Sequence, residues 1–203
     1  MTSASWREHG VRLNHIQAAL SDYMPTGGTM DELAIIEWMQ GASPALDGFM
    51  MLVSGLVIYA AIWFVLAFLF TCHPKHRELG IAVVLAVVIS FILADLILKP
   101  MVCRVRPYDV VDIEPIVDSI SSYSFPSGHT TYSFAAATAI FIYNRRWGAL
   151  ALAFSVLVGV SRVYLYMHWP TDVLAGAVVG ALSALVAVWL VRRFYVGDLE
   201  SEG

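Results

Sequence analysis

The chain has 203 residues, of which 59% are hydrophobic and only 14% are charged, and its formal net charge is −4. Soluble domains are about half apolar and about a quarter charged, so this composition excludes an ordinary soluble domain and indicates an integral membrane protein. The acidic balance argues against a nucleic-acid partner, and the length fits a single domain, residues 1–203. The two cysteines, Cys72 and Cys103, stand at the ends of different apolar runs, so we expect inert, buried thiols and no intrachain disulfide.

The N-terminal region, residues 1–42, is predicted to lie at the membrane interface. Within it, residues 31–41 are too few and too charged to span a bilayer. Apolar side chains in this segment favour a helix that lies in the plane of the interface. They are Leu33, Ile35, Ile36 and Trp38.

Five uncharged runs follow, each close to the roughly 20 residues that a helix needs to cross a bilayer. They cover residues 48–71, 79–98, 127–144, 147–166 and 171–191. The predicted fold class is therefore all-α: a membrane helical bundle over residues 43–195, with about five transmembrane helices and the interfacial helix before them. In the fifth run, Gly176 and Gly180 are four residues apart, which predicts close packing against a neighbouring helix.

The Lys and Arg residues between the runs predict the orientation, because cytoplasmic loops carry an excess of them. With five spans, six such residues fall on one face: Lys75, Arg77, Arg145, Arg146, Arg192 and Arg193. Outside the motifs described below, the opposite face has three: Arg7, Arg12 and Arg104. We therefore expect a multi-pass protein of the cell inner (plasma) membrane with a cytoplasmic C-terminus. The three motifs then fall together on the external face, periplasmic or extracellular.

The first motif, Lys99-x6-Arg106-Pro107, shares with the third an unusual set of cations at the ends of predicted spans. A cation costs roughly 2.5–3.5 kcal/mol at the centre of a membrane helix, and clustered cations also repel one another. A bound phosphate or diphosphate would neutralise Lys99, Arg106 and Arg162, and arginine binds phosphate oxygens through paired hydrogen bonds. Each cation alone is equally typical of a flanking residue that extends its charge to the interface. The three together favour an anion site.

The second motif, Pro126-Ser127-Gly128-His129, lies where a loop becomes a predicted helix. The free N–H groups of a helix N-terminus bind anions. Gly128 removes the Cβ that would block a close approach, and the Ser127 hydroxyl can donate a hydrogen bond. By itself, however, the motif is also typical of a plain N-cap preceded by proline.

The third motif, Ser161-Arg162-x5-His168-x3-Asp172, adds a candidate nucleophile. The four-residue spacing lets the Asp172 carboxylate reach one nitrogen of His168, which leaves the other nitrogen free to attack phosphorus. His129 would then be the general acid that protonates the leaving oxygen. The alternative for an isolated residue is that His168 is a structural histidine at the interface.

Asp95 precedes Lys99 by four residues inside the second run. A carboxylate within a membrane span is a functional candidate by default, and an ion pair at this spacing would position the Lys99 ammonium. The alternative is a pairing made only to solvate two charges. The six histidines lack the spacing of metal ligands, so neither a metal nor a cofactor is expected.

The three motifs, in this order, resemble the signature of the type 2 phosphatidic acid phosphatase superfamily, which includes membrane lipid phosphatases and soluble vanadium haloperoxidases. The resemblance covers about residues 99–172 at the level of motifs, and the layout of the spans extends it over most of the chain. Every signature position is filled: Lys99, Arg106, Pro107, Pro126, Ser127, Gly128, His129, Ser161, Arg162, His168 and Asp172.

The resemblance implies a metal-independent hydrolysis in two steps. His168 would be the nucleophile and form a phosphohistidine, Asp172 would orient it, and His129 would protonate the departing group. Water would then cleave the phosphohistidine. The residues that hold the phosphate would be Lys99, Arg106, Ser127, Gly128 and Arg162.

The short layout with an interfacial helix resembles the bacterial undecaprenyl-diphosphate phosphatases of this superfamily, so we expect hydrolysis of undecaprenyl diphosphate to undecaprenyl phosphate. Gly128 stands where some of those enzymes carry Asp, which leaves phosphatidylglycerophosphate, phosphatidate and lipid A phosphatases as alternatives. A phosphotransferase with the same phosphohistidine is a further alternative, whereas the His168–Asp172 pair argues against a non-catalytic binder. The expected partners are a lipid phosphate or diphosphate substrate and the membrane, without nucleic acid, and the sequence indicates no oligomeric state.

Overall fold

The computed structural model describes residues 28–40, 45–57, 60–111 and 122–196, and every regular element in these ranges is helical. This confirms the all-α fold class. The long helices are α3 (Gly28–Gln40), α4 (Ala45–Gly55), α5 (Ala61–Cys72), α6 (Arg77–Phe91), α9 (Gly128–Tyr143), α10 (Arg145–Tyr164) and α11 (Pro170–Leu190). Shorter elements are η2 (Pro74–His76), the π-helical η3 (Ile92–Leu98), α7 (Lys99–Val102), α8 (Pro107–Val110) and the π-helical η4 (Val191–Val196).

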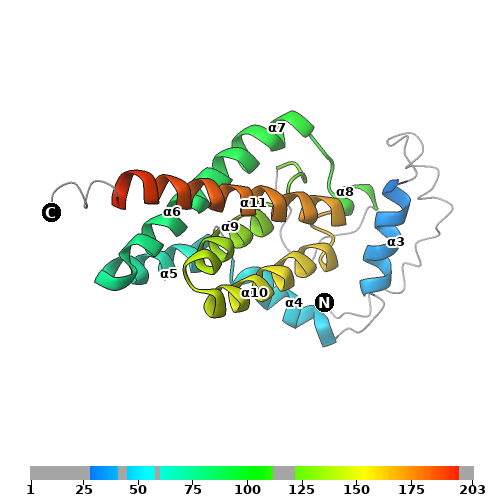
Figure 1. The fold of residues 1–203 in the computed structure, drawn as a ribbon. Coiled ribbons are helices and arrows are strands. Elements are labelled where there is room, and N and C mark those ends of the chain that lie inside the picture. The colour runs from blue at the N-terminus through cyan, green and yellow to red at the C-terminus, as the bar shows by residue number, and fades with distance from the viewer. Residues whose placement is uncertain (1–27, 41–44, 58–59, 112–121, 197–203) are drawn as a thin grey trace.

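Helix α9 is the centre of the bundle and packs against α6, α10 and α11, while α5 packs mainly against α6 (Figure 1). Small side chains on α9 make this possible, because they let neighbouring helices approach closely. Ala135, Ala136 and Ala139 are completely buried between the helices. The Ser133 hydroxyl on α9 accepts a hydrogen bond of 3.1 Å from the Trp63 indole of α5.

Two glycines of α11 account for its contact with α9. A Cβ added at Gly180 would lie 2.2 Å from the Thr131 backbone oxygen, and one added at Gly176 would lie 2.9 Å from the Ser127 backbone oxygen. Only glycine fits at such distances, so the predicted close packing is confirmed. It also brings the first turn of α11 next to the start of α9, where the predicted motifs lie.

Three stretches of the described residues are long and apolar enough to cross a membrane: Pro74–Val111, Arg145–Tyr164 and Pro170–Tyr195. Helix α9, with 16 residues, is shorter. Large apolar side chains cover the outside of the bundle, among them Phe68, Leu150 and Leu174, each more than 60% exposed. Such a surface fits a bundle surrounded by lipid rather than by water.

The first predicted run, residues 48–71, is not one helix, and this prediction is wrong. Helix α4 ends at Gly55, α5 begins at Ala61, and Ala60 has a left-handed backbone with a φ of 59°. The two halves have different packing partners, since α4 lies against α10 and α5 lies against α6. Hydropathy alone does not record that change of partner. The other four runs coincide, within a few residues, with α6 and η3, α9, α10 and α11.

Helix α3 confirms a helix in the predicted interfacial segment. Leu33 and Ile36 are buried in a cluster with Trp169 and its neighbours, whereas Trp38 on the other side is 79% exposed. One face of α3 therefore packs against the bundle, and the opposite face is exposed. Residues 1–27 and 41–42 of the predicted interfacial region lie outside the described residues.

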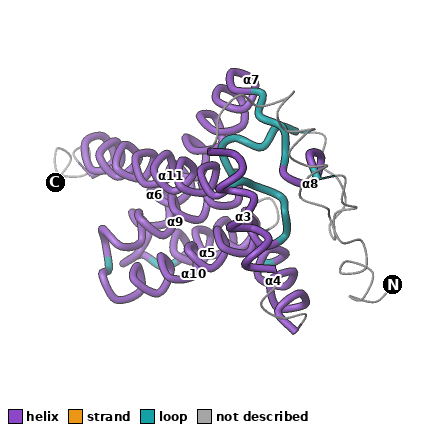
Figure 2. The backbone as a smooth tube through the Cα atoms, turned by 90° about the vertical axis from the view of Figure 1, so that its right-hand side faces the viewer, coloured by secondary structure: helices purple, strands orange, loops and turns teal. Residues whose placement is uncertain are grey.

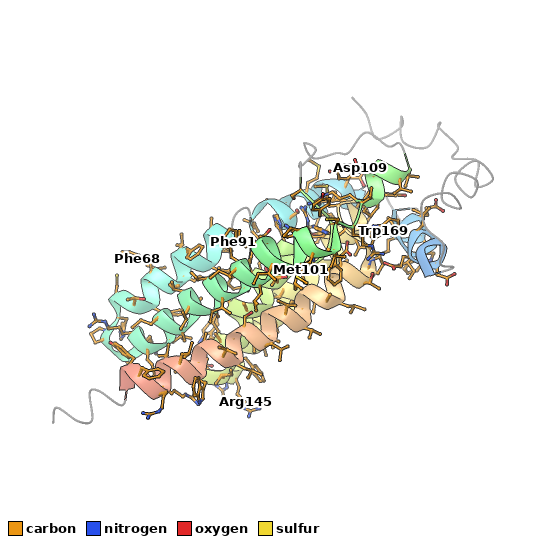
Figure 3. All side chains as sticks on the ribbon, turned by 90° about the horizontal axis from the view of Figure 1, so that it is seen from above. Phe68, Phe91, Met101, Asp109, Arg145 and Trp169 are labelled. Atoms are coloured by element: carbon orange, nitrogen blue, oxygen red, sulfur yellow. The ribbon has the colours of Figure 1, made fainter. Side chains whose placement is uncertain are left out.

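The bundle has two distinct ends. Asp109 and Trp169 lie at one end, close to α3, and Arg145 lies towards the other (Figure 3). Figure 2 shows that the described loops beside α7, α8 and α3 gather at the first end. Cys72 and Cys103, separated by α6, η3 and α7, are both exposed free thiols, so the expectation that they are buried is wrong.

Candidate active site

All three predicted motifs meet at the end of the bundle that carries α3. Lys99 opens α7, Arg106 precedes α8, the second motif begins α9, and the third joins α10 to α11. His129, in the first turn of α9, is half-buried. Four other predicted groups are close enough for their charges to act on its imidazole: Arg162, His168, Lys99 and Arg106.

His168 is buried, and its two ring nitrogens have different partners. Nδ1 lies 2.8 Å from the Ser124 backbone oxygen and 3.6 Å from Asp172 Oδ2. Because a carbonyl oxygen can only accept, this contact assigns the ring proton to Nδ1 and leaves the lone pair on Nε2. Asp172 lies beside the same nitrogen as predicted, but 3.6 Å is beyond hydrogen-bonding distance, and the Ser124 carbonyl is the hydrogen-bond partner.

Nε2 of His168 faces Arg106, whose Nη1 is 3.5 Å away. The Arg106 guanidinium also donates from Nε to the Ser122 backbone oxygen at 2.8 Å and from Nη1 to the Met167 backbone oxygen at 2.9 Å. Arg106 therefore joins the loop before α9 to the connection between α10 and α11. It places a fixed positive charge beside the nitrogen that holds the lone pair.

The protonation state of His168 follows from its surroundings. Burial lowers the pKa of His168 to about 3, while the nearby Asp172 carboxylate acts in the opposite direction. The imidazole of a free histidine has a pKa of about 6.5. The ring is therefore neutral at pH 7, which is the form in which Nε2 can act as a nucleophile.

Asp172 is a completely buried carboxylate whose oxygens have several donors. Oδ2 accepts from the Trp169 backbone N–H at 3.0 Å and from the Ser124 hydroxyl, and Oδ1 accepts from Arg104 Nη1 at 2.7 Å. Buried charges need such partners. Sequence reasoning missed Ser124 and counted Arg104 only as a flanking cation. The place of Arg104 between Lys99 and Arg106, inside the first motif, was the available signal.

Arg162 is buried like Asp172 but is only partly paired. Its Nη1 donates to the Ser54 hydroxyl of α4 at 2.5 Å. Its Nε and Nη2 are buried and have no hydrogen-bond partner among the described residues. A buried donor without a partner costs about 1–3 kcal/mol, and more when it is charged. Two such donors on one guanidinium are suited to bind the oxygens of an anion.

Lys99 and Asp95 form the predicted ion pair. The second oxygen of Asp95 accepts a hydrogen bond from the Tyr132 hydroxyl of α9, a residue that sequence reasoning missed. Asp95 lies in η3, and π-helical turns of this kind are frequent at functional sites. A Cβ added at Gly128 would lie 3.3 Å from Tyr132 Oη and 3.6 Å from Asp95 Oδ2, so the pair sits at the start of α9.

Ser127 occupies the N-cap position of α9, but its side chain makes no capping hydrogen bond. Its hydroxyl accepts from the Thr130 hydroxyl at 3.0 Å, and its backbone N–H donates to the Asp172 backbone oxygen at 3.1 Å. The first N–H groups of a helix have no intrahelical partner. Those of α9 therefore remain without a side-chain cap, directly beside His129.

These charges decide what the site is suited to bind. It combines four cations and two histidines with the carboxylates of Asp95 and Asp172, which are paired with Lys99 and Arg104. Among the described residues, no three His, Cys, Asp or Glu side chains lie together as ligands of a metal ion would. The donor set fits a tetrahedral oxyanion.

An apolar cavity of about 320 Å³ lies near the site, between α3, α9, α10 and α11. Its lining includes Ile35 and Met39 of α3 and Pro170 and Val173 of α11. Pro170 and Val173 lie within two residues of Asp172 along the chain. The polar site therefore has apolar space close to it.

Comparison with known families gives a decisive match. The family described as the PAP2 superfamily matches residues 75–195, more than half of the chain and all three motifs. The chain belongs to the PAP2 superfamily. The protein is therefore a phosphatase of this superfamily, as the resemblance of its motifs predicted.

Individual relatives of the PAP2 chain are similar at modest identity. An undecaprenyl-diphosphatase of Sulfolobus acidocaldarius is 28% identical over 143 residues, covering 66% of this chain and 69% of the relative. A lipid A 4'-phosphatase of Bacteroides thetaiotaomicron is 28% identical over 167 residues, covering 74% of this chain and 72% of the relative.

Among solved structures, the PAP2 chain is similar to a transmembrane PAP2-type phosphatidylglycerolphosphate phosphatase from Bacillus subtilis. The TM-score is 0.69 at 23% identity, and the match covers 90% of this chain and 94% of the other. At this identity the likeness concerns the fold alone. It agrees with the all-helical membrane bundle.

Proposed function

We propose that this PAP2 phosphatase hydrolyses a lipid phosphate or diphosphate through a phosphohistidine on His168, and that its substrate is undecaprenyl diphosphate. The products would be undecaprenyl phosphate and inorganic phosphate. The observation that carries the proposal is the Arg162 guanidinium, whose buried Nε and Nη2 have no partner among the described residues. A phosphate that accepts from these atoms would lie beside both histidines.

In the first step, the lone pair of His168 Nε2 attacks phosphorus while the bond from phosphorus to the leaving oxygen breaks. The positive charges of Lys99, Arg106 and Arg162 stabilise the charge that builds up on the phosphoryl oxygens. The negative charge of the bound phosphate offsets the cations around His129 and so favours its protonated form, which donates the proton that the leaving oxygen needs. The Ser124 carbonyl and Asp172 support the imidazole as it becomes cationic.

In the second step, a water molecule attacks phosphorus and the bond from phosphorus to Nε2 breaks. His129, now without its proton, takes one from that water. Inorganic phosphate leaves, and His168 returns to its neutral form. The chemistry needs no metal ion, because the three cations supply the positive charge.

The substrate part of the proposal rests on the similar undecaprenyl-diphosphatase. Lipid A is the first alternative, since the lipid A 4'-phosphatase of Bacteroides thetaiotaomicron shares the same 28% identity with this chain as the undecaprenyl-diphosphatase does. Phosphatidylglycerophosphate and phosphatidate follow, as does transfer of the phosphoryl group to an acceptor other than water. We also propose that the site faces the periplasm or cell exterior from the inner membrane, with the C-terminus in the cytoplasm.

The test is a phosphate-release panel on the purified protein in detergent. It compares undecaprenyl diphosphate, phosphatidylglycerophosphate, phosphatidate and lipid A. The highest kcat/KM is expected with undecaprenyl diphosphate, with inhibition by orthovanadate, which mimics the pentacoordinate transition state, and no effect of EDTA. A higher kcat/KM with another lipid would reassign the substrate, and a strict Mg²⁺ requirement would overturn the metal-free mechanism.

The nucleophile is tested with His168→Ala, which should abolish turnover and the acid-labile, alkali-stable phosphoryl label on the protein. His76→Ala is the matched control, because His76 is exposed, lies in η2 and touches none of the site residues described above. It should retain wild-type kcat. Turnover by a folded His168→Ala protein would refute the phosphohistidine.

A further inference from the structure

We propose that Arg104 and Glu32 are positioning residues for the Asp172 carboxylate, through which helix α3 holds the His168–Asp172 pair in its working geometry. The inference rests on the proposed function for its activity measurement. It assigns a role in catalysis to two residues and one helix. Neither residue is a signature position of the three motifs.

The Arg104 guanidinium has contacts at both Nη atoms and on one face. Nη1 donates to Asp172 Oδ1 at 2.7 Å and to the Thr171 hydroxyl at 2.6 Å. Nη2 donates to Glu32 Oε1 at 3.0 Å. The guanidinium carbon also lies 5.1 Å from the centre of the Trp169 ring, within the range of a cation–π contact.

These contacts distinguish Arg104 from Arg162. Both Nη atoms of Arg104 are already used by protein oxygens, whereas two nitrogens of Arg162 have no such partner. The nitrogens of Arg106 also have protein partners, but its Nη1 lies 3.5 Å from His168 Nε2, the proposed attacking atom, whereas Arg104 contacts Asp172 on the far side of that histidine. Arg104 therefore acts on the reaction through Asp172 and not on the phosphate.

Glu32 holds Arg104 from the opposite side. Besides accepting from Arg104, the Glu32 carboxylate accepts from the Thr171 hydroxyl at 2.9 Å and from the Thr171 backbone N–H at 3.3 Å. Glu32 belongs to α3, and Thr171 lies one residue before Asp172 in the first turn of α11. One carboxylate on α3 thus binds both the cation that holds Asp172 and the backbone next to Asp172.

The effect on catalysis follows from the position of Asp172. Asp172 Oδ2 is 3.6 Å from His168 Nδ1, while the Ser124 carbonyl is 2.8 Å from the same atom. The carboxylate is held at this separation by its other donors, of which Arg104 is the only charged one among the described residues. Without Arg104, a buried carboxylate would lose its cation and shift towards the remaining donors, which disturbs the imidazole that must accept positive charge in the first step.

The decisive variants are Arg104→Gln, Arg104→Lys and Glu32→Gln, assayed as purified full-length protein with the lipid that gives the highest wild-type activity. Loss of a charge-assisted hydrogen bond predicts a fall in kcat of about 10- to 100-fold for Arg104→Gln, with KM within about twofold of wild type. Arg104→Lys keeps the positive charge but not the two Nη donors of arginine, so its kcat should lie between that of Arg104→Gln and that of the wild type. Glu32→Gln should lower kcat less, and the double variant should be no slower than Arg104→Gln alone.

Arg145→Gln is the matched control, because Arg145 is exposed at the other end of the bundle and should keep wild-type kcat (Figure 3). Binding of orthovanadate, measured by thermal shift, supplies a readout that needs no turnover. Its Kd should be unchanged in Arg104→Gln, since Arg104 does not touch the anion. A raised Kd or KM at constant kcat would make Arg104 an anion ligand and overturn the inference, as would an unchanged kcat or no recovery by lysine.

Failure of the inference and failure of the proposed function are distinguishable. Wild-type protein that binds orthovanadate but hydrolyses no lipid of the panel would refute the proposed function. Active wild-type protein, inactive His168→Ala protein and fully active Arg104→Gln protein would refute the positioning role alone. If Arg104→Gln protein does not elute as a folded protein, Arg104→Lys is used in its place. An unchanged kcat of Arg104→Lys protein would then contradict the positioning role.

Discussion

Cations of the site differ, at the scale of single residues, in how their charges are balanced. Lys99 is paired with Asp95, and Arg104 with Asp172 and Glu32, so their charges are balanced within the protein. Arg162 is buried with two donors unused. A buried charge without a partner lowers the free energy of unfolding, and such a residue persists where binding needs it.

Replacing Arg162 by methionine should therefore raise stability and remove function. Arg162→Met keeps most of the side-chain volume and removes the unpaired donors, and we expect the free energy of unfolding to rise by about 1–3 kcal/mol. That corresponds to a rise in Tm of roughly 2–4 °C per kcal/mol for a chain of this size. Phosphate release should fall below detection. Thermal unfolding with and without orthovanadate checks this.

The comparison with orthovanadate also supplies the control. Wild-type protein and Arg145→Met should both gain Tm when the anion is added, because Arg145 is exposed and remote from the site. Arg162→Met should gain none. A variant that is less stable than wild type and still stabilised by orthovanadate would show that Arg162 is a structural residue.

Residue types and spacing were enough to predict the contacts that run along one segment of chain. His168 with Asp172 and Asp95 with Lys99 are both four residues apart, a separation that a helical turn bridges. Ser124, Arg104 and Tyr132 were missed because their partners are 37 to 68 residues away in the sequence. No local pattern marks such a contact, which exists only once the helices have packed.

At the scale of elements, the predicted helices were correct where one helix keeps one set of neighbours. Helices α10 and α11 match their uncharged runs within a few residues. The run 48–71 failed because the chain changes its packing partner near Ala60, between α4 and α5, and the residues there remain apolar on both sides of the break. Hydropathy measures transfer into the membrane and carries no information about which neighbour a helix contacts.

The contact between α9 and α11 gives a prediction at this scale. Gly180→Ala would place a Cβ 2.2 Å from the Thr131 backbone oxygen, so α11 must move away from α9. Overpacking of this kind costs about 1–3 kcal/mol of stability, and a shift of α11 also displaces Asp172 in its first turn. We expect a lower Tm together with a lower kcat in the phosphate-release assay.

Gly48→Ala is the matched control for that substitution. Gly48 is also a helical glycine, but nothing lies within 4 Å of a Cβ added there. Its replacement should leave kcat unchanged and leave Tm unchanged or slightly higher, because alanine is favoured over glycine in a helix by about 0.5–1 kcal/mol. Equal effects of the two substitutions would show that close packing at Gly180 does not position α11.

For the whole molecule, charge and chemistry are segregated between the two ends of the bundle. The exposed cations of the η2, α10 and η4 segments, such as Lys75, Arg145 and Arg192, lie on the face predicted to be cytoplasmic. The three motifs meet at the opposite end, where Figure 3 labels Asp109 and Trp169, and the topology predicted a common end independently of the motif chemistry. The fold thus supports the arrangement of one site at one end, and the side of the membrane that this end faces is a separate question.

The two native cysteines can test which side of the membrane the site faces. Both are exposed, and they lie at opposite ends of the helical segment formed by α6, η3 and α7. Cys103 follows α7 at the site end, and Cys72 ends α5 at the other. In intact cells, a membrane-impermeant maleimide should label Cys72→Ser protein, which keeps Cys103. Cys103→Ser protein, which keeps Cys72, should be labelled only after the membrane is permeabilised. The double variant reports background labelling, and phosphate release confirms that each variant is folded. The reverse pattern would place the site and its lipid phosphate on the cytoplasmic side and refute the orientation deduced from the Lys and Arg residues.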